Sequence, residues 1–374
     1  MRCALAIFWL FVCTRRVVTS FAPTYGKLPN KYHTSTSLFS ENPSSEGNYR
    51  SNLNDLRKIL EQSWNEKTMS HVPTNAESAA TAATEAIINT LNDPACEKGK
   101  IIMIDIALPS LDPSFGSFYD DVGAVEFCCE LAKGVNSQRE NCSNLRNQGR
   151  VAIVVKDENL VSRAKRFVES ASDENIDATI EEIDDFAGLS LSTDADDPQK
   201  PTSPYRIGSF LGSADIPSGP NMINDICKLV AKNALPETEA QKDDIIIISC
   251  PISQPELIGV RWLVSKHGSS KTIIVVNNRL NPLPRELMAS ETVYSVLPLI
   301  ARSVGGDDSA KPNPKIVVLR RYPNAWEIHV DDSKSGVGFE LVSSVPEDKV
   351  GIRGPSMEYI SNRVKEYMQQ KFGA

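Results

Sequence analysis

Asp244 to Ile252 read DIIIISCPI, and this stretch decides the fold. Its run of isoleucines lacks polar alternation, which is typical of a parallel strand that is buried on both faces of a sheet. The pattern recurs at Lys100 to Leu108 (KIIMIDIAL), Arg150 to Lys156 (RVAIVVK) and Lys271 to Val276 (KTIIVV). These four stretches predict the central strands of a sheet that helices cover on both sides.

Segments with a helical spacing of apolar residues separate the buried strands. Strands and helices that alternate at these distances predict right-handed crossovers between parallel strands. The stretch 176–183 alternates weakly and is predicted to form a short edge strand, after which periodicity is lost from Leu189 to Pro220. The predicted helices are 51–67, 75–91, 122–135, 160–172, 222–235, 255–266, 285–302 and 355–371.

The last third of the chain has a different pattern. Between Lys315 and Ser343, three short apolar stretches are separated by turn residues, which predicts antiparallel hairpins. In the middle stretch, apolar residues alternate with Glu327, His329 and Asp331, so we expect one buried and one solvated face. The predicted fold class is α/β: a Rossmann-like mixed sheet with parallel core strands, helices on both faces and an antiparallel C-terminal edge.

The beginning of the chain has the layout of a targeting presequence. A basic start precedes the apolar run Cys3 to Cys13, which is too short for a membrane anchor, and small or modest side chains follow at Val18-Thr19-Ser20. Phe21-Ala22-Pro23 comes next, in a stretch without acidic residues. This layout resembles the bipartite plastid presequence of diatoms and related algae, with a signal peptide over 1–20 and a transit peptide or linker over 21–48. The resemblance implies import into the plastid stroma.

The rest of the chain is predicted to be one α/β domain over 50–374 with an insert loop at 189–220. The formal charge is -8, and it becomes -13 without residues 1–40, which hold five basic residues and no acidic ones. The negative charge of the chain after residue 40 argues against nucleic acid or anionic lipid as a partner. No later apolar run could cross a membrane, and the six later cysteines have neither disulfide nor zinc spacing, so we expect free thiols.

A series of short motifs in the second half resembles a known family. A buried strand ends in Pro251, Gln254-Pro255-Glu256 opens a helix, and the next strand leads to Asn281-Pro282. Leu319-Arg320-Arg321-Tyr322 and Trp326-Glu327-Ile328 follow in the same order as in the DUF1995 family of plants, algae and cyanobacteria. The likeness covers roughly residues 73–366.

This resemblance implies a role but no reaction, because the family has no assigned chemistry. In plants it includes a chloroplast factor that is needed for photosystem II accumulation, and the domain also occurs fused to a plastid adenylate kinase. For this chain the resemblance implies a non-enzymatic auxiliary factor. Its partners would be plastid proteins, including components of photosystem assembly in the thylakoid.

The sequence contains no motif for cofactor or metal chemistry. Neither a phosphate-binding loop nor a dinucleotide-binding glycine pattern follows any predicted strand, so we expect no cofactor and no adenylate kinase activity. His71, His267 and His329 are expected to be exposed. We therefore expect no histidine to act as a base for a serine or cysteine nucleophile. Cys250 ends the strongest strand, where packing explains it better than catalysis. We therefore predict no catalytic residue and no metal site.

Polar residues do gather where the predicted strands end, and they form a candidate ligand site. In open α/β sheets, ligands bind outside the carboxyl ends of the strands. Carboxylates beside an arginine could orient a phosphate or hold a metal; alternatively, they only cap helices and satisfy loop amides. Arg320 and Arg321 alternate on a strand, so one should point inward and need a carboxylate. The candidates are Asp105, Asp157, Asn277, Asn278, Arg279 and Arg320.

Two functions are compatible with these residues. The first is the stromal assembly factor, which should have an exposed apolar patch and a shallow crevice at the strand ends. The second is a small-ligand or nucleotide-binding protein, which could also be an enzyme, with a deep pocket lined by Asp105, Asp157 and Asn277.

Overall fold

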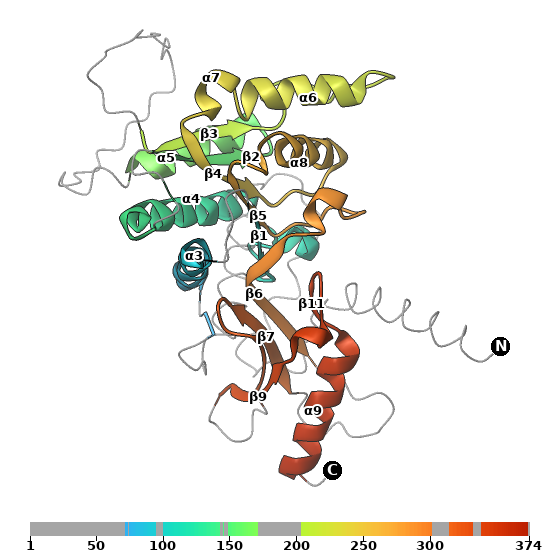
Figure 1. Cartoon of the computed structure of the whole chain (residues 1–374). Coiled ribbons are helices and arrows are strands. Elements are labelled where there is room, and N and C mark those ends of the chain that lie inside the picture. Colours follow the sequence, from blue (N-terminus) through green and yellow to red (C-terminus); the bar gives the residue numbers. More distant parts are fainter. Residues whose placement is uncertain are drawn as a thin grey trace, which may run out of the picture. The chain divides into compact units, whose positions relative to one another are not determined.

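The computed structural model contains a nine-stranded mixed sheet (Figure 1). It describes residues 72–73, 75–94, 100–142, 145, 149–170, 203–300, 314–331 and 338–372. The strand order is β3-β2-β4-β5-β1-β6-β7-β8-β9. From β3 to β6 every neighbouring pair is parallel, and from β6 to β9 every pair is antiparallel. The predicted fold class is confirmed.

The parallel half is built from strands and crossover helices in alternation. Its strands are β1 (Ile101–Ile106), β2 (Arg150–Val155), β3 (Tyr205–Ser209), β4 (Asp243–Ser249), β5 (Thr272–Val276) and β6 (Glu291–Ile300). The helices are α3 (Ala76–Asn92), α4 (Asp121–Ser137), α5 (Glu158–Ser170), α6 (Met222–Asn233), the short α7 (Glu237–Ala240) and α8 (Gln254–His267). All four buried strands predicted from the sequence are present within a few residues of their expected bounds.

The C-terminal part adds the antiparallel strands and one helix. The strands are β7 (Lys315–Arg321), β8 (Trp326–Asp331) and β9 (Glu340–Val345). A separate two-stranded hairpin, β10 (Val350–Gly351) with β11 (Gly354–Pro355), leads into the helix α9 (Met357–Phe372). The predicted hairpins and final helix are confirmed.

Helices cover the two faces of the sheet (Figure 1). On one face, α3, α4 and α5 pack on alternate strand residues such as Ile104, Ile247 and Ile274. On the other, α6 and α8 pack on the intervening residues, such as Ile246 and Ile273, and α9 covers the antiparallel strands. Because side chains alternate along a strand, a run of isoleucines supplies both cores at once.

The predicted helix at 285–302 is wrong. Only a single 3-10 turn, Arg285–Leu287, forms there, and β6 follows. The β-branched and aromatic residues of ETVYSVLPLI favour a strand, and Pro298 disfavours the interior of a helix. Pro298 lies beyond Val296, the last residue of β6 that is paired with β1, so its missing N–H interrupts no bond between those two strands.

The predicted insert loop at 189–220 contains a strand. Residues 189–202 lie outside the described part, but β3 pairs in parallel with β2 and forms the edge of the sheet. The segment YRIGS is short and lacks a continuous apolar run, so its sequence resembles that of a loop. A Cβ atom at Gly208 would lie 2.4 Å from the carbonyl oxygen of Asn233. This is too close, so only glycine fits at this position.

Three side chains that the sequence predicts to be exposed are buried. His329 and Asp331, expected on a solvated face of β8, are 5% and 4% exposed. Both side chains are buried, and His329 Nε2 lies 3.0 Å from Glu327 Oε2. His267, expected at an exposed helix end, is 8% exposed and packs edge-on against Trp262.

The burial of His267 leads to a prediction about acid stability. Burial, followed by the nearby charges of Lys271 and Lys266, lowers the pKa of His267 to about 4. In the unfolded chain, His267 is protonated as the pH falls below about 6.5, but in the folded chain it stays neutral down to about pH 4. The free energy of unfolding therefore decreases as the pH is lowered from 6.5 to 4. We expect His267→Phe to remove about 1–2 kcal/mol of this loss, after allowance for solvent screening.

Urea unfolding at pH 7 and pH 5 measures this effect. The phenylalanine ring keeps the edge contact with Trp262 and removes Nε2, which has no hydrogen-bond partner among the described residues. An equal loss of stability between the two pH values in both proteins would contradict the prediction.

Several expectations fall on residues outside the described part. They are the presequence (1–48), the helix at 51–67, His71, the strand at 176–183 and the acidic stretch of the insert loop. Within the described part, no helix is both long and apolar enough to cross a membrane.

Candidate functional site

The carboxyl ends of β1 and β5 are joined by Asn277. Asn277 is fully buried, and its backbone is in the left-handed region at φ 45°. Its side-chain oxygen accepts a hydrogen bond from the backbone N–H of Ile106 at 2.6 Å, and its amide nitrogen donates to the carbonyls of Ile106 and Leu111 at 3.1 and 2.7 Å. Asparagine tolerates this backbone conformation better than most residues. Asn277 therefore fixes the loop after β1 against the end of β5.

Arg279 forms an ion cluster beside Asn277. Its Nε and Nη2 donate to the two carboxylate oxygens of Asp112 at 2.8 and 2.7 Å, and Nη2 also donates to Asp105 at 2.7 Å. Asp112 is only 2% exposed. Burial alone would lower the pKa of Arg279, but the hydrogen bonds with Asp112 and the nearby carboxylate charges raise it above its ordinary value. The guanidinium is permanently charged: Nε and Nη2 donate to carboxylates of the same chain, and Nη1 donates to the carbonyl of Asn278 at 3.1 Å.

The structure brings four of the six predicted site residues together and leaves two elsewhere. Asp105, Asn277, Asn278 and Arg279 lie at the ends of β1 and β5, where Asn278 Oδ1 accepts from the N–H of Leu280. The other two are Asp157 and Arg320.

Asp157 and Arg320 have local structural partners. Asp157 accepts a hydrogen bond from the N–H of Leu160 at 3.1 Å in the first turn of α5, so it acts as a helix cap. Arg320 shares a row across the sheet with Asp105 through Ser295, but it donates to the carbonyl of Thr292 and lies 3.8 Å from Glu291.

A small cavity lies at the carboxyl ends of β2 and β4. Its volume is about 50 Å³, and it is lined by Tyr119, Asp121, Val125, Lys156, Leu160, Ser249, Cys250, Ile252 and Glu256. Cys250 has a φ of 41°, an unusual conformation for a side chain of its type, and its thiol donates to the carbonyl of Leu111 at 3.6 Å. This carbonyl also accepts from Asn277, so the two sites share one loop.

Cys250 is a thiol and not a thiolate at neutral pH. Burial raises its pKa to about 12, although hydrogen bonds with Ser249 and Tyr119 oppose the shift. Burial also raises the pKa of Tyr119, so the phenol cannot serve as a base for the thiol. This agrees with the expectation that Cys250 is buried for packing. The five described cysteines are all free, and no group of three or more His, Cys, Asp or Glu side chains in the described ranges is arranged to hold a metal ion.

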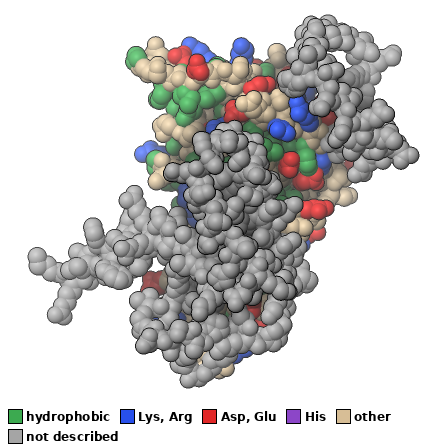
Figure 2. Space-filling view, turned by 180° about the vertical axis from the view of Figure 1, so that it is seen from behind, with side chains coloured by type: hydrophobic (Ala, Val, Ile, Leu, Met, Phe, Trp, Pro, Cys, Tyr) green, Lys and Arg blue, Asp and Glu red, His purple; other side chains and the backbone are tan. Residues whose placement is uncertain are grey.

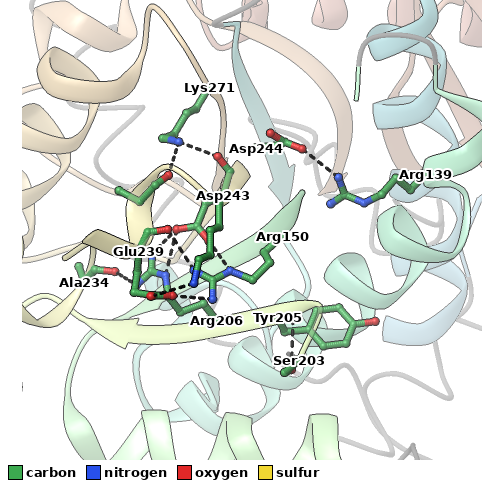
Figure 3. A network of polar contacts seen from close by, with 12 residues as sticks. Arg139, Arg150, Ser203, Tyr205, Arg206, Ala234, Glu239, Asp243, Asp244 and Lys271 are labelled. Carbon is green, nitrogen blue, oxygen red and sulfur yellow. Dashed lines mark hydrogen bonds and ion pairs between the residues drawn. The ribbon is translucent and has the colours of Figure 1, made fainter. Parts of the chain in front are cut away.

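A second charged network lies at the opposite, amino ends of the parallel strands (Figure 3). Asp243 is completely buried at the start of β4 and accepts hydrogen bonds from Arg150 at 3.2 Å and Arg206 at 3.0 Å. Lys271 donates to the backbone carbonyl of Asp243 at 2.6 Å, and Arg150 also pairs with Glu239 at 2.7 Å. These contacts join β2, β3, β4 and the start of β5, so the network holds the sheet together.

Sequence reasoning missed Asp112, Tyr119 and Glu256. Asp112 lies 167 residues from Arg279, and nothing local in the sequence links them. A signal did exist for Glu256, because Ser253-Gln-Pro-Glu256 has the spacing of a capping box.

The chain matches the family described as Domain of unknown function (DUF1995) over residues 73–350. The chain belongs to this family. The DUF1995 match begins just before α3 and ends at the start of the β10–β11 hairpin, so it contains the whole nine-stranded sheet and both sites. The resemblance seen in the sequence motifs is thus confirmed at the level of the family.

Other comparisons add little to the DUF1995 assignment. A comparison with curated proteins finds no significant match. Among solved structures, the flagellar accessory protein FlaH from Methanocaldococcus jannaschii is similar, with 11% identity and a TM-score of 0.23. The similarity covers 66% of this chain and 91% of FlaH.

Proposed function

We propose that this chain is a non-catalytic auxiliary factor of the plastid stroma that supports assembly of photosystem II or related thylakoid complexes through protein contacts. One observation carries the proposal: the polar groups at the strand ends bind one another. Arg279 is held by Asp105 and Asp112, and Asn277 by the backbone of the neighbouring loop. A ligand would have to break these buried bonds in order to use them.

Exposed apolar side chains support the same proposal. Figure 2 shows hydrophobic side chains on the surface at the end of the molecule where α6 begins. Ile216 and Ile223, in the loop before α6 and in its first turn, are 63% and 60% exposed. We propose that these two large aliphatic side chains, which stay in water, form part of a contact site for another protein.

A small-ligand or nucleotide-binding protein remains the second candidate. The cavity at the ends of β2 and β4 favours it, because that edge of an open α/β sheet is where ligands bind. Its volume of about 50 Å³ is well below the roughly 300–1,000 Å³ that small-molecule sites occupy. Size therefore favours the assembly factor over this alternative.

Affinity capture from detergent-solubilised thylakoids tests the proposal. We expect the tagged full chain to recover photosystem II subunits, and the double variant Ile216→Ser with Ile223→Ser to recover at least fivefold less. Leu341→Ser is the matched control, because Leu341 is 54% exposed on the edge strand β9 and should not affect recovery. If the wild-type chain recovers no photosystem subunit, or binds ATP, ADP or NADPH in equilibrium titrations, the assembly role is wrong.

A further inference from the structure

The 50 Å³ cavity lies at the point where the connections of the sheet change direction. The chain leaves β2 through Lys156 towards α5, on one face of the sheet. It leaves the adjacent strand β4 through Cys250 towards α8, on the other face. Loops that diverge to opposite faces open a crevice between neighbouring strand ends, which is the usual ligand position in such sheets. Lys156, Ser249 and Cys250 all line this cavity.

The helix ends around the crevice do not favour a phosphate. In many α/β proteins a phosphate binds the free N–H groups at a helix N-terminus. In this chain each of the three surrounding helices already has a carboxylate of its own at that position. The bonds are Asp120 with the N–H of Val122 at 3.2 Å for α4, Asp157 with Leu160 at 3.1 Å for α5, and Glu256 with Ser253 at 2.6 Å for α8. A second anion would meet these negative charges.

The lining of the cavity favours a cation. Glu256 is 3% exposed, and only its Oε2 accepts hydrogen bonds, from the N–H groups of Ile252 and Ser253. Its Oε1 has no hydrogen-bond partner among the residues that the structure describes. Asp121 adds a second carboxylate, while Lys156 is the one basic side chain in the lining and is exposed. A buried carboxylate with an unused oxygen is a strong acceptor for a positively charged donor.

The cavity and its rim favour an ammonium on an aliphatic stem. A volume of about 50 Å³ has room for a small polar group such as an ammonium. Ile252 is 47% exposed in the lining and offers an apolar surface to an aliphatic stem. A lysine side chain has both parts in the required order.

We infer that this cavity receives the ammonium group of a lysine side chain from a partner protein. Glu256 and Asp121 supply the counter-charges, Ser249 supplies a hydroxyl oxygen, and Ile252 packs on the aliphatic stem. The inference rests on the proposed function, since it names the chemistry by which a protein partner is recognised. It places that recognition at the strand ends, apart from the apolar residues tested above.

The chemistry can be tested with n-butylammonium as the probe. In two-dimensional NMR titrations of the full chain, we expect n-butylammonium to shift the amide signals of Cys250 and Ile252, and 1-butanol and inorganic phosphate to leave them unchanged. Asp121→Asn should weaken probe binding about two- to fivefold, the scale of one exposed ion pair. Lys156→Met should strengthen it by a similar factor, because it removes the competing cation. Glu358→Gln, in the first turn of α9, is the matched control.

The source of the lysine is tested by acetylating the amines of the thylakoid extract before capture. We expect acetylation of the extract, or Asp121→Asn in the chain, to lower recovery of photosystem subunits at least threefold. If the probe binds but neither change affects recovery, the cavity takes a free amine and the partner lysine is wrong. If the probe does not bind, or phosphate binds instead, the inference fails while the assembly role stands. If the probe binds and no photosystem subunit is captured, the assembly role fails instead.

Discussion

In the Asp243→Ala variant, the free energy of unfolding should fall by about 3–5 kcal/mol, the usual cost of removing one partner from a buried ion pair. The variant leaves Arg206 without its carboxylate partner and Arg150 with Glu239 alone. Both guanidiniums are largely buried, so water cannot replace the lost bonds fully. Because the network joins the amino ends of four strands, its loss affects the whole parallel half of the sheet.

Urea unfolding followed by circular dichroism measures this loss. The matched control is Glu237→Ala, which removes an ion pair with Lys266 in which the glutamate side chain is 77% exposed. Exposed pairs contribute about 0–1 kcal/mol, so this variant should be nearly as stable as the wild type. If both variants lost the same small free energy of unfolding, the burial of Asp243 would not add to the stability of the fold. The Asp243 network would then not hold the parallel strands together.

The sequence predicts the parallel half of the fold because one signal dominates there. A continuous apolar run such as Ile245–Ile248 fills two cores at once, and few other structures accommodate it. The signal fails at the edges. β3 has two well-buried residues among five, and β6 has an apolar spacing that also fits a helix, so neither can be identified from periodicity alone.

The candidate site is predictable only in part, for a related reason. The rule that parallel strand ends share one edge correctly places Asp105 beside Arg279. The same rule cannot tell which end residues turn back to cap a helix, as Asp157 does, because both uses need the same side chain. Nor can it supply Asp112, whose bond to Arg279 depends on how the loop after β1 folds over the strand ends.

Arg279→Met is expected to cost about 3–5 kcal/mol of stability, because it leaves the buried carboxylate of Asp112 unpaired. Methionine keeps much of the volume, so the effect reports the charge and not a cavity. Asp105 is partly exposed and can be solvated once the guanidinium is gone. Arg261→Met is the matched control, since the Arg261 side chain is 54% exposed in its pair with Glu286, and the variant should change stability by less than about 1 kcal/mol.

A double variant separates the charge from the packing. Asp112→Asn in the Arg279→Met background removes the unpaired charge, while the asparagine oxygen can still accept the hydrogen bond from the N–H of Ser114. We expect the double variant to be more stable than Arg279→Met alone, with a coupling between the two changes of about 1–3 kcal/mol in urea unfolding. Additive losses would mean that Arg279 stabilises the strand ends by packing. The strand-end polar groups would then be available to a ligand, and the main argument for an assembly factor would be lost.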